Sequence, residues 1–163
     1  MDVFEQLQAK LAAHPMGAPE SESILEILRI LFNPEEAAMA LHLPFKPARD
    51  SDIARQAGLP VDEVVRVCEA LADRGLVYAF EARGRHFYML FPTAPGIYEF
   101  PFMKHGRLDL PFERLAELWD DYYTHGWGAE MKGRRTHMAR VIPIQESVAA
   151  QQTVLTFEEV AGY

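Results

Sequence analysis

Apolar and polar positions alternate most regularly between residues 49 and 92. Asp50 or Ser51 can cap a short first helix, and Gly58 supplies the left-handed residue that commonly follows a helix end. Pro60 fits the first turn of a second helix. The apolar positions of this second helix recur at the 3.6-residue spacing of one helix face: Val61, Val64, Val65, Cys68, Leu71 and Ala72. The pattern therefore predicts two helices joined by a tight turn.

Two strands are expected after Gly75 ends the second helix. Leu76–Phe80 has the composition of a strand, residues 81–85 that of a hairpin turn, and His86–Phe91 that of a return strand. Leu43–Pro47 should be extended, because each proline moves the residue before it out of the helical region, and it can supply a small first strand. This order of elements predicts a winged helix-turn-helix, in which the hairpin is the wing.

Three helices are expected before this unit. Asp2–Ala13 has apolar residues at helical spacing. Ser23 and Glu26 have the spacing of a capping box, ahead of a helix whose apolar residues cover more than one stripe and thus indicate a central place in the core. Asn33–Glu36 favours the start of a third helix, because it combines a cap, a proline in the first turn and acids near the positive end of the helix dipole.

An irregular aromatic segment, Pro92–Met103, follows the wing and is called the arm here. Its three prolines predict that it lacks a regular helix. Tyr98, Phe100 and Phe102 alternate with other residues, so the three rings can project to one side and anchor an interface. They could equally complete the core of this domain, and in both cases we expect at least two rings to be buried. We favour contact of part of the arm with a second copy of the chain or with a further region of the protein.

Leu110–His125 is expected to form one more helix, which Gly126–Gly128 ends. The fold class predicted from these patterns is mainly α with a small antiparallel β wing, a winged helix-turn-helix with flanking helices. We expect one structural domain overall. It comprises an N-terminal helical layer at 1–43, a winged helix-turn-helix core at 44–92, and a C-terminal extension at 93–163.

The charge of the chain bears on its partners. The chain has 163 residues and a formal net charge of −8. Residues 1–43 hold two basic and seven acidic side chains, residues 44–91 hold seven of each, and residues 92–163 hold seven basic and ten acidic ones. A phosphate backbone would repel the chain as a whole, although a local patch could still bind it. No apolar run approaches the roughly 20 residues of a membrane span, and Met1–Glu5 lacks the features of a signal peptide, so we expect a cytoplasmic protein.

Contacts with a nucleic acid or with a protein partner would involve arginines. A DNA-reading helix offers basic or amide side chains to the bases, whereas Val61–Arg74 carries a net charge of −2, which favours a packing role. The wing tip, Arg83–His86, indicates the opposite, because basic wing residues can lie beside the minor groove. The basic run Lys132–Arg140 could bind phosphate or an acidic partner, or be neutralised by neighbouring acids. The candidate contact residues are Arg66, Arg83, Arg85, Arg134 and Arg135.

The sequence carries no motif for catalysis or for metal binding. Cys68, the single cysteine, lies on the inward face of a predicted helix, so we expect it to be buried and inert. The six histidines are dispersed, with no pair at helical i, i+4 spacing. No G-x-S-x-G, P-loop or G-x-G-x-x-G pattern occurs. We therefore assign no catalytic, cofactor-binding or metal-binding residue to this chain.

Four stretches of the chain, in this order, resemble the N-terminal region of iron–sulfur proteins from anaerobes. They are Ile27–Ala37, Leu41–Pro47, Pro92–Met103 and Arg140–Ile144. In that family a winged-helix-like segment precedes a cysteine-rich, ferredoxin-type region that binds [4Fe–4S] clusters. The resemblance covers nearly all of the chain and implies that the cluster cysteines lie in a C-terminal region missing from these 163 residues. No cluster ligand can be assigned here, because the chain has a single cysteine.

The resemblance implies a non-catalytic accessory or interaction module of a cytoplasmic [4Fe–4S] electron-transfer protein. The partner would be another protein, a second copy of the chain, or the chain's own missing C-terminal region. The alternative is a transcription regulator that binds DNA through Val61–Arg74 and the wing. Thr153–Val160 resembles the entry of a further helix, so we expect the protein to continue past Tyr163.

Overall fold

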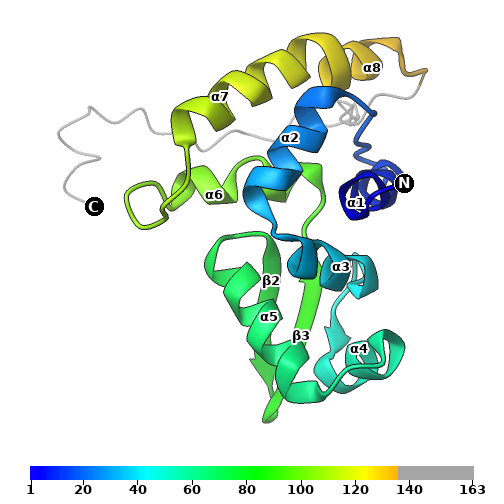
Figure 1. Ribbon diagram of the computed structural model, residues 1–163. Helices are drawn as coiled ribbons and strands as arrows, with labels where there is room; N and C mark the ends of the chain where they lie inside the picture. The colour runs from blue at the N-terminus through cyan, green and yellow to red at the C-terminus, as the bar shows by residue number, and fades with distance from the viewer. Residues whose placement is uncertain (136–163) are drawn as a thin grey trace, which may run out of the picture.

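The computed structural model of the chain describes residues 1–135 and shows a mainly helical protein with a small antiparallel sheet (Figure 1). The elements in chain order are α1 (Val3–Ala12), α2 (Glu22–Leu31), α3 (Pro34–His42), β1 (Ala48–Arg49), α4 (Asp50–Ala57), α5 (Val61–Asp73), β2 (Val77–Ala82), β3 (Arg85–Leu90), η1 (Thr93–Ile97), α6 (Phe100–Met103), α7 (Phe112–Asp121), η2 (Tyr122–Trp127) and α8 (Gly128–Gly133). In Figure 1, α7 and α8 lie at one end of the molecule, and the sheet lies with α4 and α5 at the other.

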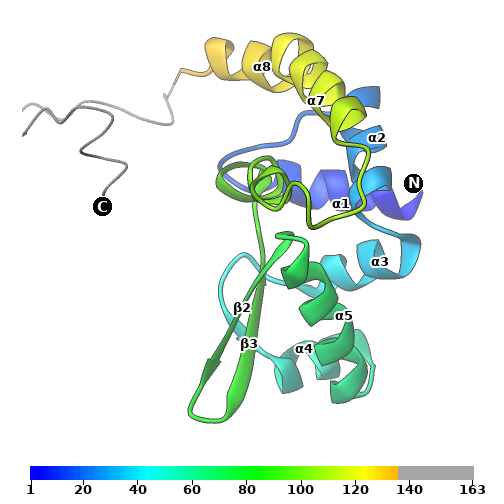
Figure 2. The ribbon, with the colours of Figure 1, turned by 90° about the vertical axis from the view of Figure 1, so that its left-hand side faces the viewer.

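The three strands form one antiparallel sheet in the order β1-β3-β2. β2 and β3 pair along their whole length, and β1 joins them with Ala48 opposite Tyr88. The hairpin turn consists of Arg83 and Gly84, whose φ angles of 54° and 69° suit a two-residue hairpin loop. The predicted hairpin is thus present, with a shorter turn than expected. Figure 2 shows α4 and α5 on one side of this hairpin.

Capping boxes start the first and third helices. The Asp2 carboxylate accepts a hydrogen bond from the N–H of Glu5, whose own carboxylate accepts one from the N–H of Asp2. Asn33 and Glu36 make the same reciprocal pair at the start of α3, which confirms the start predicted for that helix. These boxes satisfy N–H groups that have no partner within the helix.

The start of α2 differs from the prediction. Ser21 caps this helix, and Ser23 and Glu26 do not form a capping box. Both of the latter residues instead contact α7: Ser23 hydrogen-bonds to Asp121, and Glu26 forms a two-fold ion pair with Arg114. The sequence spacing fits both arrangements, and the packing of α7 onto α2 selects the second.

The buried face of α5 is confirmed in part. Val64, Cys68 and Leu71 are buried, but Val61 is 43% exposed, and Val67 is buried although it was not predicted to be. Val65 is only half-buried. The buried stripe turns towards Val67 because α5 packs mainly against β2, α4 and α3. Helix α2 packs mainly against α1 and α7. All of these helices contribute to one hydrophobic core.

The bounds of the first strand and the start of α4 also differ from the sequence prediction. The first strand is Ala48–Arg49, not Leu43–Pro47, since prolines lack the N–H that a ladder needs. Pro44 still contributes its carbonyl, which accepts a hydrogen bond from the N–H of Leu90. No side chain caps α4, and Asp50 is its first residue, so neither Asp50 nor Ser51 is the cap.

The arm contains one short helix. Backbone angles at Ala94, Pro95 and Gly96 lie outside the helical region, as expected for a proline-rich segment. Phe100–Met103 nevertheless forms α6, so the prediction that the arm has no regular helix is wrong at its end. Pro101 is compatible with this turn because the N–H groups of a first helical turn need no partner within the helix.

The long helix after the arm does not stop at Gly126–Gly128. It widens into η2 and continues as α8 to Gly133. Gly128 permits this, because a Cβ there would clash with the carbonyl oxygen of Tyr123. Glycine is a common stop signal for helices, but Gly128 serves close packing within a helical run.

Three hydrogen bonds join this helical run to the connection between α1 and α2. The indole N–H of Trp127 donates to the carbonyl of Met16 over 2.9 Å, and the hydroxyl of Tyr122 donates to the carbonyl of Pro19 over 3.0 Å. The Arg134 guanidinium donates to the carbonyl of Pro15 over 2.8 Å. These contacts tie the N-terminal helical layer to the last described helix.

Within residues 1–135, no helix has both the length and the apolar character that crossing a membrane would require. The basic run beyond Arg135, the segment Val141–Ile144 and the helix entry at Thr153–Val160 lie outside the described residues.

Candidate interaction surfaces

The outer face of the sheet is rich in aromatic side chains. Cross-strand partners share a face, so Tyr78 opposite Met89 and Phe80 opposite Phe87 lie on the same side. Among the alternate residues, Val77, Tyr88 and Leu90 are buried, and the Tyr88 hydroxyl donates a hydrogen bond to Glu69 of α5. Tyr78 is 46% exposed, and Phe80, Phe87 and Met89 are half-buried. We call these four residues the outer sheet face.

The rings of this face form a continuous series that extends into the arm. Phe87 and Phe80 stack with centroids 5.1 Å apart, and Phe80 lies 5.6 Å from Tyr78. Tyr78 lies 6.0 Å from Phe91, which packs edge-on against Phe100 at 4.6 Å. This surface was not predicted from the sequence, although apolar residues on both faces of β2 and β3 were a visible signal for it.

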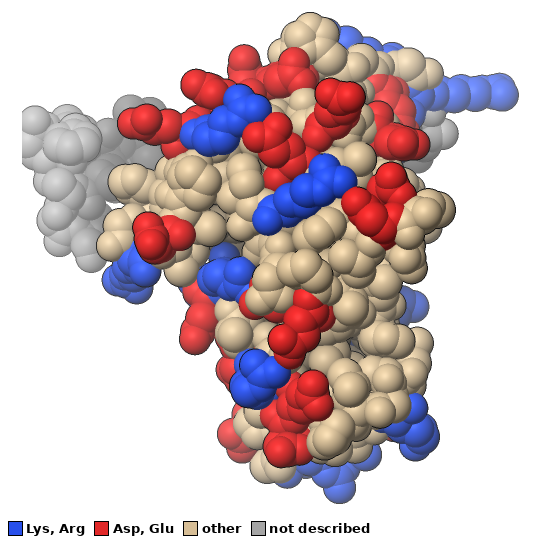
Figure 3. Space-filling view, viewed as in Figure 1, with Lys and Arg blue, Asp and Glu red and all other residues tan. Residues whose placement is uncertain are grey.

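Basic residues flank the outer sheet face. Arg49 is opposite Phe87 in the β1–β3 pair, and Arg85 is two residues before Phe87 on β3, so both share the face of the rings. Neither has an ion-pair partner among residues 1–135, and the same holds for Arg83 at the turn. Figure 3 shows basic side chains at the end of the molecule where the hairpin tip lies.

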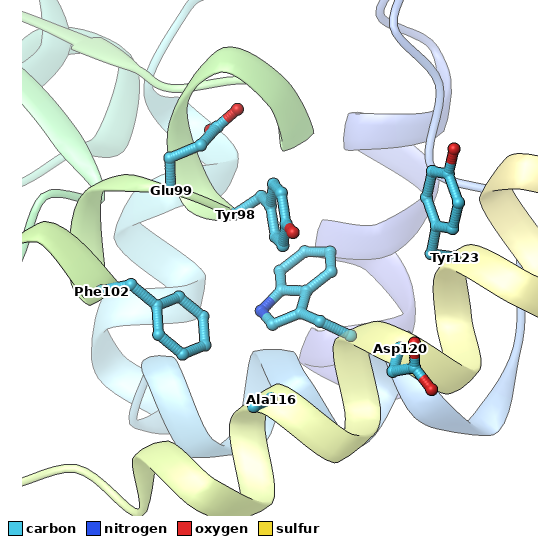
Figure 4. A pocket seen from close by; sticks show the side chains of 7 residues that line it. Tyr98, Glu99, Phe102, Ala116, Asp120 and Tyr123 are labelled. Atoms are coloured by element: carbon cyan, nitrogen blue, oxygen red, sulfur yellow. The ribbon is translucent and has the colours of Figure 1, made fainter.

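A hollow lies between the arm and α7, and we call it the groove (Figure 4). It has a volume of about 550 Å³. Its lining comprises Tyr98, Glu99, Phe102, Ala116, Trp119, Asp120 and Tyr123. Tyr98 packs edge-on against Trp119, with centroids 5.0 Å apart. The groove is therefore aromatic, with two carboxylates in its lining.

The three arm rings do not project to one side. Tyr98 and Phe102 line the groove, whereas Phe100 packs on Phe91 and against Gly75 at the end of the outer sheet face. Tyr98 is 42% exposed, and the other two rings are only half-buried, so the prediction that at least two would be buried is wrong. The turn of α6 points Phe100 and Phe102 in different directions and gives each a separate set of neighbours.

The arginines predicted to contact a nucleic acid or partner have different environments. Arg66 forms an exposed ion pair with Glu35 at 2.7 Å. Arg134 is held by Glu130 at 2.6 Å and by a backbone carbonyl, as expected if the basic run is neutralised within the chain. Arg135 is exposed at the end of the described residues. Arg83 and Arg85 lie at the hairpin tip.

Cys68 does not fit the role of a cluster ligand. It is fully buried, and burial together with the nearby Glu69 raises the pKa of its thiol to about 12, so the thiolate that binds metal is absent near neutral pH. A [4Fe–4S] cluster is held by four such thiolates, and the chain has one cysteine. In the described part of the chain, no three His, Cys, Asp or Glu residues lie close enough together to hold a metal ion.

No protein-family model matches this chain, and neither a curated protein nor a solved structure is similar enough to it to count as a match.

Proposed function

We propose that this chain is a non-catalytic winged-helix module that mediates a protein–protein contact within a cytoplasmic [4Fe–4S] electron-transfer protein. The winged-helix assignment is supported by the order α3-β1-α4-α5-β2-β3, and by the pairing of β1 with β3 beside the hairpin. The iron–sulfur context comes from the sequence resemblance. The clusters belong to the region that this resemblance implies, since Cys68 cannot hold one.

The observation that carries the interaction role is the outer sheet face. Its rings remain partly open to solvent next to Arg49 and Arg85, whereas Val77, Tyr88 and Leu90 on the opposite face of the sheet are buried. Contiguous apolar surface rimmed by polar groups marks an interaction site, and aromatic and arginine side chains are common anchors in such sites. We propose that this face contacts the iron–sulfur region, through apolar side chains and carboxylates of that region.

Phe80→Ser should weaken this contact at least tenfold, because Phe80 packs against both Phe87 and Tyr78 in the ring series. The first measurement is the gene sequence beyond codon 163: a cysteine-rich continuation supports the proposal, and a stop codon contradicts it. The encoded iron–sulfur region is then expressed separately, and its affinity for the 163-residue chain is measured by calorimetry. Val61→Ser, at an exposed apolar residue on α5, is the control and should leave the affinity unchanged. Equal affinities for the two variants would show that the sheet face is not the contact.

DNA binding is the second candidate, and one observation favours it: Arg83 and Arg85 project from the hairpin tip without an ion pair in the described part of the chain. The acidic side chains of α5 and the pairing of Arg66 with Glu35 oppose it.

We expect random duplex DNA to bind with a Kd on the order of 10⁻⁴ M at physiological salt, the weak end of non-specific affinity. The physical reason is the net charge of −8. Fluorescence anisotropy with a labelled duplex measures this. Tight binding that is lost in the double variant Arg83→Ala, Arg85→Ala would make DNA recognition the better function.

A further inference from the structure

A further hollow lies next to the groove, nearer the end of α8. It has a volume of about 360 Å³ and is lined by Tyr123, Gly128, Met131 and Lys132. Tyr123 lines both hollows and is 62% exposed between them. Because Lys132 lies in the last turn of α8, the second hollow leads from the groove to the point where the chain leaves that helix. Groove and hollow thus share Tyr123 and lie next to each other along the helical run.

The charges of the groove indicate what chemistry would fill it. Glu99 and Asp120 have no ion-pair partner among residues 1–135. Glu99 accepts one hydrogen bond, from the N–H of Gly96 at 2.6 Å. The aromatic lining favours apolar side chains, and the two carboxylates favour a cation next to them. A complementary occupant is therefore an apolar segment that carries a basic residue.

The chain itself has such a segment shortly after α8. Arg140 is followed by four apolar residues, Val141–Ile144, and a residue that precedes a proline, as Ile142 does, favours an extended backbone. The helical run from Ala116 to Gly133 is about 26 Å long at the rise of an α-helix. The nine residues from Gly133 to Ile142 span roughly 30 Å when extended, so Ile142 can reach Ala116.

We propose that Arg140–Ile144 of this chain occupies the groove, with Ile142 among the aromatic rings and Arg140 paired with Asp120. The tether favours this occupant over a separate protein, because a short linker holds the segment at an effective concentration in the millimolar range. A second copy of the chain would have to compete against that concentration. This proposal does not depend on the role of the outer sheet face. With Arg140–Ile144 in the groove, the residues after Ile144 would leave the domain on the side of the groove.

Disulfide trapping in the full chain tests this proposal. Ala116 is exposed in the groove. The native Cys68 should not form a disulfide, because its buried thiol is protonated near neutral pH. The pair Ala116→Cys, Ile142→Cys is oxidised with oxidised glutathione, and products are separated on a non-reducing gel. We expect a disulfide within one chain, because the two Cα atoms would approach to the 4–7 Å or so that a disulfide spans.

The matched control replaces Ser51, an exposed residue of α4, in the pair Ser51→Cys, Ile142→Cys. The groove pair should cross-link at least tenfold faster than this control. Equal rates would overturn the proposal, and so would a product cross-linked mainly between two chains.

A charge variant tests the role of Asp120 separately. Added to the variant Ala116→Cys, Ile142→Cys, the substitution Asp120→Lys should slow cross-linking, because it would place a cation against Arg140. Glu113→Lys, on the same helix but outside the groove lining, should leave the rate unchanged. If both variants change the rate equally, only the net charge matters, and the assignment of Arg140 to the groove is wrong.

Discussion

Leu28→Ala should lower the free energy of unfolding by about 2–5 kcal/mol, the range for a fully buried leucine whose removal leaves a cavity. Leu28 is 0% exposed on α2, and this helix contacts both α1 and α7. The cavity would thus open where the N-terminal helical layer meets the helix that follows the arm. Urea denaturation followed by circular dichroism measures the change.

Leu59→Ala is the matched control for that variant. Leu59 is 36% exposed at the turn between α4 and α5, so the same truncation there removes few buried contacts. Its free energy of unfolding should change by less than about 1 kcal/mol. If Leu28→Ala and Leu59→Ala had similar effects, α2 would not be at the centre of the core.

Gly75→Ala should destabilise the protein by more than Gly58→Ala. Both glycines have positive φ, 78° and 69°, so each alanine costs about 1–2 kcal/mol for the left-handed backbone. At Gly75 the new Cβ would also lie 2.7 Å from the Cβ of Phe100 and 3.1 Å from its carbonyl carbon. At Gly58 a Cβ would meet nothing within 4 Å. The contact with the arm should add about 1–3 kcal/mol at Gly75, as overpacking does elsewhere.

This pair of variants tests whether the arm packs on its own domain. Chemical denaturation gives the two free energies of unfolding, and their difference isolates the contact with Phe100. A difference near zero would mean that the arm leaves this position readily in solution. Sedimentation of the same variants shows whether association changes with it.

Local sequence signals determined most of the secondary structure. The capping box at Asn33 and Glu36, the left-handed Gly58 and the hairpin between β2 and β3 depend on residues close in sequence. The burial of Cys68 also followed from its neighbours at helical spacing. These features have local causes, such as N–H groups that need partners and apolar residues that share a face, so a short window of sequence contains them.

The candidate surfaces depended on tertiary structure. In the arm, three rings spaced two residues apart looked equivalent, yet the turn of α6 sends Phe100 to the sheet and leaves Tyr98 and Phe102 at the groove. The other wall of that groove, including Trp119, comes from α7. No local pattern states which ring will meet which helix, because that depends on how α7 packs onto α2.

The sequence by itself determined a mainly helical chain with one hairpin, a buried cysteine and an acidic net charge. Tertiary structure decided the cap of α2, the continuation of the helix through Gly128 and the faces on which the exposed rings gather. The physical reason is the range of the interactions. Capping and periodicity act over a few residues, whereas the contact of Ser23 with Asp121 joins residues far apart in the chain and exists only once the helices have packed.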